Sequence, residues 1–438
     1  MLARITPKPL SGTVPAIPSK SMAHRMIIAS ACANGVTQVA CPATCADIDA
    51  TVRCLTALGA KIERDSEGFT VHPLPKSVDK GILRALAGGV LDCGESGSTL
   101  RFMLPVSCAL GADATFTGAG RLGERPLGPL ASELVAAGAS FEGLGGFPLK
   151  ASGRIRPGRF ELPGDVSSQY ISGLLLAAPL LPGPSDIAVT GEIESMPYID
   201  LTIRVLHLFG VDVIVERGAT PGGLPHTVFS VPEGGYRTPG ETAVEGDWSN
   251  AAFWLCAGAL GEHSITVRGI EGTSGQGDRA VTAALTLFGA KGARNAHNAT
   301  VRPDRLHGIE LDAHNIPDLV PVLSAVASCA EGNTRITGCA RLRIKESDRL
   351  QTTASELNAL GADVRVDGDA LEILGQGRLA GGSVDSHNDH RIAMMAAVAA
   401  VRCASPVEIH GAEAVNKSYP QFFEHYRLLG GDVELIDE

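Results

Sequence analysis

Apolar and polar positions along the chain form one arrangement that recurs six times. In each copy an apolar helical run ends at a glycine and is followed by a short strand-like stretch, as in LTALGAKI at residues 55–62. A glycine directly after a helical run favours a helix C-cap. The six glycines are Gly59, Gly138, Gly210, Gly289, Gly361 and Gly430. The pattern predicts six units in which a helix leads into a strand.

The spacing of these glycines favours compact domains over a solenoid. Successive glycines lie 79, 72, 79, 72 and 69 residues apart, which is longer than the common solenoid repeats. Three units in each of two domains is the compact alternative. The Pro/Gly-rich segment from Gly218 to Gly240 lies near the midpoint of the chain and is the candidate domain boundary.

A second helix-like run precedes each of the first, and it begins with small or polar residues. Ser, Asp, Asn and Pro at these starts fit helix N-caps and first turns. The six starts lie at residues 19–21, 94–99, 165–169, 247–250, 317–318 and 388–391. Short stretches rich in Val, Ile and Thr, such as residues 264–268, complete each unit. The predicted fold class is α/β.

Composition and hydropathy disfavour two classes of protein, general nucleic-acid binders and membrane-spanning proteins. The 438 residues are 44 % hydrophobic and 19 % charged, with a net charge of -11, so a general nucleic-acid binder is disfavoured. The longest apolar stretch, Leu174 to Leu181, is far shorter than the roughly 18 residues that a membrane span needs. We expect a soluble, unexported protein. The ten cysteines form no C-x-x-C pair, which predicts reduced, buried thiols and no metal site.

Cationic and hydroxyl side chains recur at equivalent helix starts of this acidic chain. Free N–H groups and the positive end of the helix dipole favour anions there. Taken singly, each residue is most simply a surface charge or a cap, but their recurrence predicts a shared anion site. The residues are Lys20, Ser21, Arg25, Gly97, Arg101, Arg125, Ser167, Ser168, Gln169, Lys345, Arg349, His390, Arg391 and Lys417.

The segment RLRIKESDRL, residues 341–350, carries six charges. A helical wheel started at Lys345 places Glu346 and Arg349 on or beside the apolar face and Asp348 opposite it. Glu346 is therefore expected at the edge of a site, where a carboxylate among cations suits proton transfer. Asp318, at another helix start, is a second candidate if it faces the same site.

Nine segments in order resemble the 3-phosphoshikimate 1-carboxyvinyltransferase (EPSP synthase) family of enolpyruvyl transferases. They are PSKSMAHR (18–25), GESGSTLRF (94–102), GAGRLGERPLG (118–128), GDVSSQY (164–170), SMPYID (195–200), NIPD (315–318), RIKESDRL (343–350), NDHRIAM (388–394) and NKSYPQFF (416–423). The resemblance implies two inside-out α/β domains, each of three βαβαββ-like units, with a hinged cleft between them. The implied domains are residues 19–238, and residues 1–18 with 239–438.

The resemblance also implies a reaction. The enolpyruvyl group of phosphoenolpyruvate moves to the 5-hydroxyl of 3-phosphoshikimate through a tetrahedral intermediate, with release of phosphate, in the shikimate pathway that leads to chorismate and the aromatic amino acids. It implies no metal and no organic cofactor, and neither nucleic acid nor membrane as a partner. A cytoplasmic monomer is expected, with glyphosate as a candidate inhibitor.

Residue roles follow from the resemblance position by position. Asp318 is expected as the base toward the 5-hydroxyl, Glu346 as the acid toward C3, and Lys20 as a further proton carrier, with the division of these roles left open. Phosphoenolpyruvate is expected at Lys20, Gly97, Arg125, Gln169, Arg349, Arg391 and Lys417. 3-Phosphoshikimate is expected at Lys20, Ser21, Arg25, Ser167, Ser168, Gln169, Ser195, Asp318 and Lys345. Arg101 and Tyr198 are either structural supports or ligand contacts.

Two positions depart from the family pattern, and three rival functions remain. Glu95 and Arg341 stand where many members carry Asn, which puts those substrate contacts in doubt. The first rival is the sister family that acts on UDP-N-acetylglucosamine, which places a reactive Cys five residues before the loop Arg, whereas this chain has Gly120 there. The second is a non-catalytic phosphometabolite-binding protein, and the third is a repeat-built scaffold for protein interactions.

Overall fold

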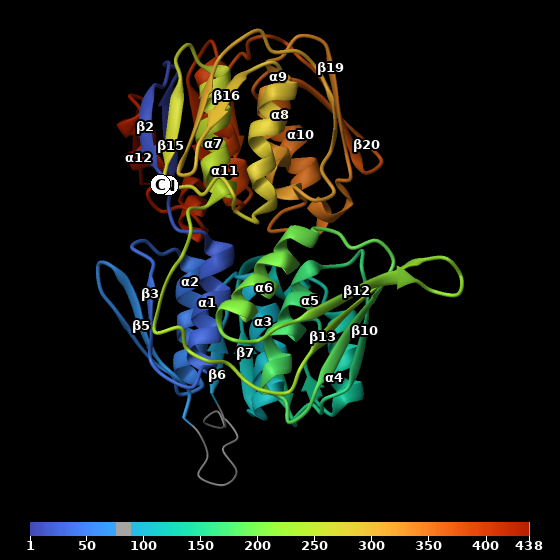
Figure 1. The fold of residues 1–438 in the computed structure, drawn as a ribbon. Coiled ribbons are helices and arrows are strands. Elements are labelled where there is room, and N and C mark those ends of the chain that lie inside the picture. Colours follow the sequence, from blue (N-terminus) through green and yellow to red (C-terminus); the bar gives the residue numbers. More distant parts are fainter. Residues whose placement is uncertain (76–88, 438) are drawn as a thin grey trace. The chain divides into compact units, whose positions relative to one another are not determined.

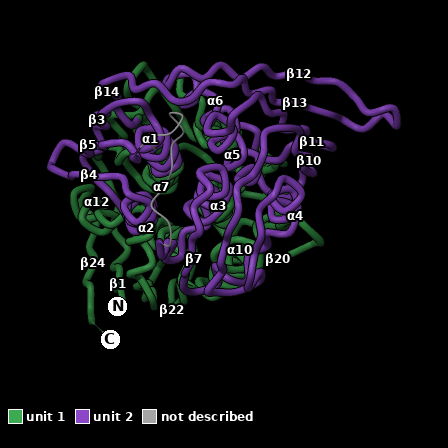
Figure 2. Tube along the Cα trace, turned by 90° about the horizontal axis from the view of Figure 1, so that it is seen from below, with its two compact units in different colours: residues 1–19, 245–438 green, residues 20–244 purple. Residues whose placement is uncertain are grey.

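The computed structural model describes residues 1–75 and 89–437. These form two compact units, which Figure 2 shows in different colours. Unit 1 is residues 1–19 with 245–438, and unit 2 is residues 20–244. The sequence placed the changes at 18/19 and 238/239 instead. Residues 239–244 fall in unit 2 because they include strand β14 (Glu241–Ala243), which pairs in parallel with β3 (Thr37–Ala40) of the same unit.

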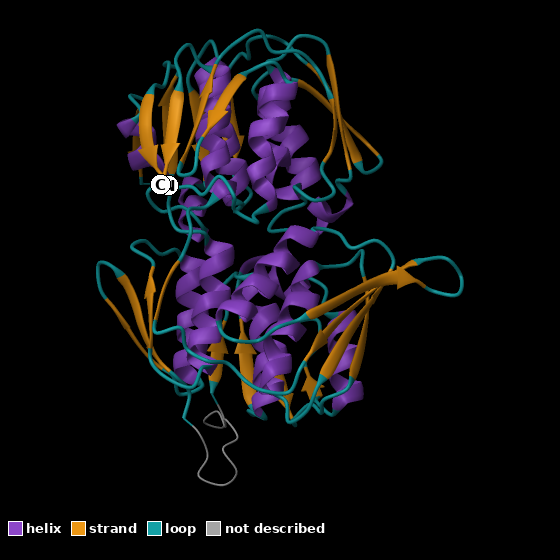
Figure 3. Cartoon of the chain, in the orientation of Figure 1, coloured by secondary structure: helices purple, strands orange, loops and turns teal. Residues whose placement is uncertain are grey.

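Each unit has a helical centre with strands around it (Figures 1 and 3). Three helices in each unit begin the repeats and are buried along nearly their whole length, as their uniformly apolar and small residues require. In unit 2 they are α1 (Lys20–Cys32), α3 (Gly97–Leu110) and α5 (Ser168–Ala177). In unit 1 they are α7 (Trp248–Leu260), α9 (Val320–Ser328) and α11 (His390–Ala399).

A second helix follows the first in each repeat. In unit 2 these helices are α2 (Ala46–Ala57), α4 (Gly128–Ala137) and α6 (Met196–Leu208). In unit 1 they are α8 (Val281–Leu287), α10 (Arg349–Ala359) and α12 (Phe422–Leu428). Each of the six ends near its predicted glycine, and all six glycines have positive φ, between 78° and 121°. This conformation is strained for other residues. The predicted caps are confirmed.

The strands of unit 2 form three four-stranded sheets. Their orders are β14-β3-β5-β4, β6-β7-β9-β8 and β10-β11-β13-β12. In each, the first pair is parallel and the other two pairs are antiparallel. The remaining strands are β4 (Lys61–Arg64), β5 (Gly68–His72), β6 (Val90–Asp92), β7 (Ala114–Thr117), β8 (Ser140–Glu142), β9 (Leu149–Ser152), β10 (Arg159–Pro163), β11 (Ser185–Thr190), β12 (Ile214–Ala219) and β13 (Pro225–Val231).

Unit 1 repeats this plan in the orders β16-β17-β15-β2, β18-β19-β21-β20 and β22-β23-β1-β24. The strands are β1 (Leu2–Thr6), β2 (Gly12–Pro15), β15 (Ile265–Arg268), β16 (Lys291–Arg294), β17 (Asn298–Arg302), β18 (Glu310–Asp312), β19 (Asn333–Thr337), β20 (Asp363–Asp367), β21 (Ala370–Leu374), β22 (Gly382–Asp385), β23 (Val407–His410) and β24 (Asp432–Ile436).

The chain crosses between the two units directly after strands β2 and β14. Strand β2 completes a sheet of unit 1, yet the next element, α1, belongs to unit 2. Strand β14 completes a sheet of unit 2, and the next element, α7, belongs to unit 1. The N-terminal strand β1 likewise lies between β23 and β24, the last two strands of the chain. Each unit is therefore three repeats only when strands from distant parts of the sequence are counted.

Three further expectations can be compared with the fold. The segment from Gly218 to Gly240 is not a linker, because it contains the end of β12 and all of β13, which form an antiparallel hairpin in unit 2. All ten cysteines are buried and outside disulfides, as predicted. Among the described residues, the helices all fall short of the length and apolar character needed to cross a membrane.

Candidate active site

In unit 2 the predicted site residues lie at the starts of the buried helices. Lys20 begins α1, and its Nζ lies 2.8 Å from Oδ2 of Asp47 in the first turn of α2. Both side chains are mostly buried. Thr99 of α3 donates to the Asp47 carbonyl. The sequence did not single out Asp47, although its place in the first turn of a predicted helix was visible. Its carboxylate holds the Lys20 ammonium in a fixed position.

Arg25 is buried and donates hydrogen bonds within α1 and to the neighbouring helices α5 and α6. Its Nε donates to Thr202 Oγ1 at 2.7 Å, and its Nη2 donates to Ser172 Oγ and to the Tyr198 carbonyl. Its Nη1 donates to the Ser21 carbonyl in the preceding turn of α1. Burial lowers the pKa of Arg25 to about 10. These contacts bind α1 to α5 and α6, so Arg25 has a structural task besides the ligand contact expected of it.

Gly97 provides the room in which two guanidinium groups approach the start of α3. A Cβ added at Gly97 would lie 2.7 Å from Arg125 Cζ and 2.9 Å from Arg101 Nη1. The Arg101 Nη1 donates to Gln169 Oε1 at 2.8 Å, and Gln169 Nε2 donates to Ser98 Oγ. The start of α3, the loop with Arg125 and the start of α5 are therefore brought together in this unit.

Two of the predicted site serines of this unit, Ser167 and Ser195, are helix N-caps. Ser167 is the N-cap of α5, and its Oγ accepts from the backbone N–H of Gln169 at 3.3 Å. Ser168 is buried beside it. Ser195, at the N-cap of α6, has a left-handed backbone with φ 57°. Non-glycine residues seldom adopt that conformation, which tends to occur at functional sites.

In unit 1 Arg349 is the centre of a cluster of three carboxylates. Its side chain is 1 % exposed. Its Nε and Nη2 donate to the two oxygens of Asp389 at 2.9 and 3.1 Å, its Nη1 donates to Asp318 at 2.9 Å, and its Nη2 also donates to Glu346 at 2.6 Å. Burial alone would lower the pKa of Arg349, but the charges of Asp389, Glu346 and Asp318 raise it above its ordinary value.

Asp318 joins two further predicted residues to this cluster. Lys345 Nζ lies 3.3 Å from its Oδ1, and Arg391 Nη2 lies 3.4 Å from its Oδ2. Arg391 Nη1 also donates to the Asp318 carbonyl. Burial lowers the pKa of Lys345 to about 8, although the Asp318 charge opposes that change. Asp318, Lys345, Glu346, Arg349 and Arg391 thus form one connected set.

Lys417 lies in the 3-10 helix Ala412–Lys417, and its Nζ donates to the Asn388 carbonyl. His387 and Asn388 both have positive φ, which shapes the turn before α11. Asp389 caps α11 by accepting from the Arg391 backbone N–H at 2.9 Å. The same carboxylate binds the Arg349 side chain, so one residue sets both the helix start and the cluster.

The helical wheel placed the charges of residues 341–350 correctly but on a wrong premise. Residues 340–344 form a 3-10 helix, and α10 begins only at Arg349. Asp348 is the N-cap, whose side chain accepts from the Gln351 backbone N–H. Residues 345–348 lie outside a helix, so a constant advance per residue from Lys345 does not hold there. Arg349 is buried and Asp348 is more exposed, as predicted, while Glu346 is fixed by its contact with Arg349.

Comparisons with known proteins show the family of the chain. The family described as "EPSP synthase (3-phosphoshikimate 1-carboxyvinyltransferase)" matches residues 5–426. The chain belongs to the EPSP synthase family. A 3-phosphoshikimate 1-carboxyvinyltransferase of Clostridium kluyveri is 40 % identical, with 98 % of this chain and 97 % of the relative covered. One of Clostridium acetobutylicum is 41 % identical, with the same coverage.

Solved structures confirm the fold of this EPSP synthase family member. An EPSP synthase from Acinetobacter baumannii superposes with a TM-score of 0.80 at 29 % identity, with 99 % of this chain and 100 % of that chain covered. The enolpyruvyl transferase NikO from Streptomyces tendae has a TM-score of 0.75 at 19 % identity, with 99 % and 98 % covered, and supports the fold alone. The predicted class, two α/β domains built of repeats, is confirmed.

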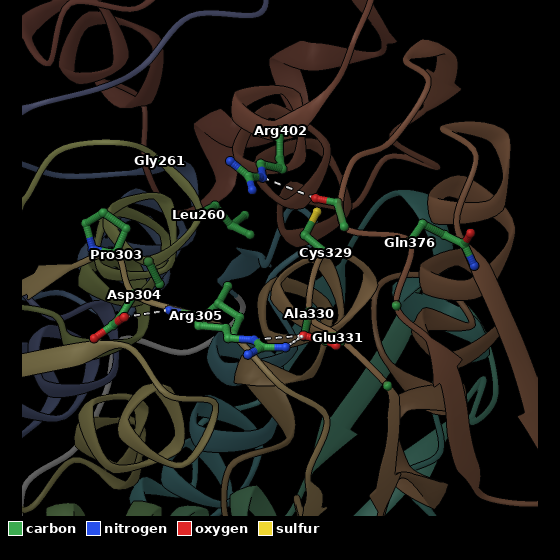
Figure 4. Close-up of a pocket in the computed structure, with 15 residues that line it drawn as sticks. Leu260, Gly261, Pro303, Asp304, Arg305, Cys329, Ala330, Glu331, Gln376 and Arg402 are labelled. Atoms are coloured by element: carbon green, nitrogen blue, oxygen red, sulfur yellow. Dashed lines mark hydrogen bonds and ion pairs between the residues drawn. The ribbon is translucent and has the colours of Figure 1, made fainter.

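Two cavities in this family member differ in their relation to the predicted residues. Figure 4 shows one of about 630 Å³ in unit 1, lined by the ends of α7 and α9 and by Arg305 and Arg402. Its described lining contains none of the predicted substrate-binding residues. A cavity of about 680 Å³ in unit 2 includes Arg125 and is otherwise largely apolar, with Phe147 among its lining residues. Cavity volume alone therefore does not single out the predicted site residues.

Proposed function

We infer that the chain, as an EPSP synthase family member, transfers the enolpyruvyl group of phosphoenolpyruvate to 3-phosphoshikimate in the shikimate pathway. We propose that both clusters bind these anionic substrates. Lys20, Gly97, Arg125, Gln169, Arg349, Arg391 and Lys417 bind phosphoenolpyruvate. Lys20, Ser21, Arg25, Ser167, Ser168, Gln169, Ser195, Asp318 and Lys345 bind 3-phosphoshikimate. The positive starts of the buried helices support this assignment, because they favour phosphate and carboxylate groups.

The proposed proton transfers use the carboxylates of unit 1. Asp318 removes the proton from the 5-hydroxyl of 3-phosphoshikimate while the hydroxyl oxygen forms a bond to C2 of phosphoenolpyruvate. Glu346 supplies the proton that C3 gains as the double bond opens. In the second step the Glu346 carboxylate takes a proton back from C3, the double bond re-forms, and phosphate leaves with the electrons of its C2–O bond. Lys20 is a further candidate for carrying one of these protons.

The observation that carries this proposal is the buried Arg349 side chain that contacts both Asp318 and Glu346. A guanidinium donates but cannot act as a base, so it holds the two carboxylates in place and leaves the proton transfers to them. Asp318 accepts from Nη1 and Glu346 from Nη2 of the same guanidinium. Asp389 binds Arg349 through both of its oxygens, which accept from Nε and Nη2.

The test measures phosphate release from phosphoenolpyruvate with 3-phosphoshikimate, and in parallel with UDP-N-acetylglucosamine. Release only with 3-phosphoshikimate is expected. Glu346→Gln should lower kcat by about 10²–10⁴-fold, the usual worth of a general acid or base, while 3-phosphoshikimate still binds. The matched control is Glu331→Gln, which removes a carboxylate that pairs with Arg305 on the surface of the same unit. Near-normal turnover of Glu346→Gln would remove Glu346 from its role.

We also propose that glyphosate competes with phosphoenolpyruvate and that the enzyme is a cytoplasmic monomer. Gly97 lets the Arg125 guanidinium approach the start of α3 closely, and a cation in that position supports the binding of a second anion of this kind. Each unit has its own apolar core, which supports a monomer. Inhibition kinetics against phosphoenolpyruvate, light scattering and cell fractionation test the three statements separately.

A further inference from the structure

A partly buried series of hydrogen bonds in unit 1 ends on Arg391 and is not used by the proposed proton transfers. Arg391 Nη2 donates to Ser249 Oγ at 2.7 Å, and Ser249 Oγ donates to Oδ2 of Asp278. Ser249 lies in the first turn of α7, and Asp278 lies in the 3-10 helix Gly277–Ala280. Asp278 is 3 % exposed. None of the nine segments that carry the family resemblance contains Ser249 or Asp278.

The direction of these hydrogen bonds determines how Ser249 and Asp278 hold the Arg391 guanidinium. A serine hydroxyl has one proton to donate and lone pairs to accept. Because Asp278 takes that proton, the lone pairs of Ser249 are directed toward Arg391. Asp318 contacts the same guanidinium through its carbonyl and its Oδ2. The Arg391 head is therefore held by groups from α7 and from the 3-10 helix Pro317–Leu319.

A second set of contacts fixes Asp278 relative to α7. Gln276 Oε1 accepts from the Trp248 backbone N–H at 3.0 Å, one residue before Ser249. Gln276 Nε2 donates to Glu245 Oε1 and to the Gly246 carbonyl. Each of these groups is buried. Both partners of the Ser249–Asp278 hydrogen bond thus stand on segments that are themselves tied together, and such support keeps a site pre-organised.

We propose that Ser249 and Asp278 are positioning residues, which aim the Arg391 guanidinium at the anionic group of phosphoenolpyruvate. This rests on the proposed role of Arg391 in binding phosphoenolpyruvate. Neither residue touches the reacting atoms in this assignment; both act through Arg391. Their loss should weaken the orientation of one substrate and leave the binding of the other almost unchanged.

The charges around Asp278 are consistent with an acceptor at neutral pH. Burial and the Asp318 charge raise the pKa of Asp278 to about 6, against the effect of Arg391 and of the Ser249 hydrogen bond. Asp247, the N-cap of α7, is a further carboxylate near it. Helix α8, which also packs against this 3-10 helix, carries no charged side chain between Val281 and Leu287. Above pH 6 the Asp278 carboxylate is ionised and accepts the Ser249 proton.

The test compares Ser249→Ala with Ser249→Thr in the full chain. Ser249→Ala should raise the KM for phosphoenolpyruvate about tenfold, because a charged donor loses its acceptor, and should change the KM for 3-phosphoshikimate less than twofold. Ser249→Thr keeps the hydroxyl and should restore the wild-type KM within about threefold. The matched control is Ser328→Ala, which removes a buried hydroxyl that bonds only within α9 among the described contacts.

A double-mutant cycle with Arg391→Lys separates this inference from the proposed function. If Arg391→Lys raises the KM for phosphoenolpyruvate and Ser249→Ala adds little in that background, the coupling confirms that Ser249 acts through Arg391. Additive effects, or failure of Ser249→Thr to rescue, would overturn the inference while the role of Arg391 stands. An unchanged KM in Arg391→Lys would instead refute the proposed role of Arg391, and the inference with it.

Discussion

Neutralising Asp278 should stabilise unit 1 above pH 6 and not below pH 4. The pKa of Asp278 is raised from 3.8 to about 6, first by burial and then by the Asp318 charge. A carboxyl whose folded-state pKa is raised costs free energy once it ionises, so its favourable contribution is complete below pH 3.8 and lost as the pH rises through 6. One pKa unit corresponds to about 1.4 kcal/mol, so the cost above pH 6 is ~3 kcal/mol.

Asp278→Asn removes the charge and keeps an oxygen that accepts from Ser249. The free energy of unfolding of unit 1 should therefore rise by ~2 kcal/mol at pH 8, after ~1 kcal/mol is deducted for a weaker hydrogen bond, and should not rise at pH 4. Both tryptophans of the chain, Trp248 and Trp254, are buried in α7 of unit 1. Urea titration followed by tryptophan fluorescence thus reports this unit.

The control for this measurement is Asp363→Asn on strand β20, where an exposed ion pair with Arg365 contributes little. A gain in Asp278→Asn of equal size at pH 4 and pH 8 would refute the electrostatic reasoning. The same variant separates stability from function, since a weaker acceptor for Ser249 should raise the KM for phosphoenolpyruvate while the protein becomes more stable.

Two further predictions concern the substrate-binding groups. Gly97→Ala should raise the KM for phosphoenolpyruvate about tenfold, since its Cβ would lie 2.7 Å from Arg125 Cζ and displace that guanidinium. The control is Gly128→Ala, where an added Cβ meets nothing within 4 Å. Equal kinetics for the two variants would contradict the reasoning. Because the pKa of Lys345 is lowered to about 8, its positive charge is lost as the pH rises through 8, and the KM for 3-phosphoshikimate should rise there. Lys345→Arg should remove that rise in KM. An identical pH profile for the two proteins would exclude Lys345 as the source of the rise.

Local features of the fold could be predicted from the sequence, while distant pairings could not. A glycine C-cap and a polar N-cap depend on neighbouring residues, and each predicted helix start and glycine lies at the end of an observed helix. The pairing of β1 with β23 and β24 joins residues about 400 positions apart, and no local pattern specifies it. The same holds for β14, whose pairing with β3 moves the boundary of unit 2 to residue 244.

In the candidate site, likewise, some residues could be predicted from the sequence and their partners could not. Lys20, Arg349 and Arg391 were found because charge at a helix start is visible in the sequence. Their partners Asp47, Asp389 and Ser249 were not assigned roles, since each also fits an ordinary cap or first-turn residue. What distinguishes them is a contact with a cation on another helix, which only the folded chain provides. Arg25 shows the converse, because its contacts with Thr202 and Ser172 give it a structural task.

The burial of these helices explains why the candidate site residues lie at the helix starts. Helices α7, α9 and α11 pack against one another and are buried on all sides, so their middle turns offer no surface to a polar ligand. Only their first turns combine free N–H groups with positive dipole ends. Cations there repel one another unless carboxylates intervene, and Asp318 and Asp389 contact Arg349 at this level. The acidic residues of the cluster therefore hold these cations together, in addition to the proton transfers proposed for two of them.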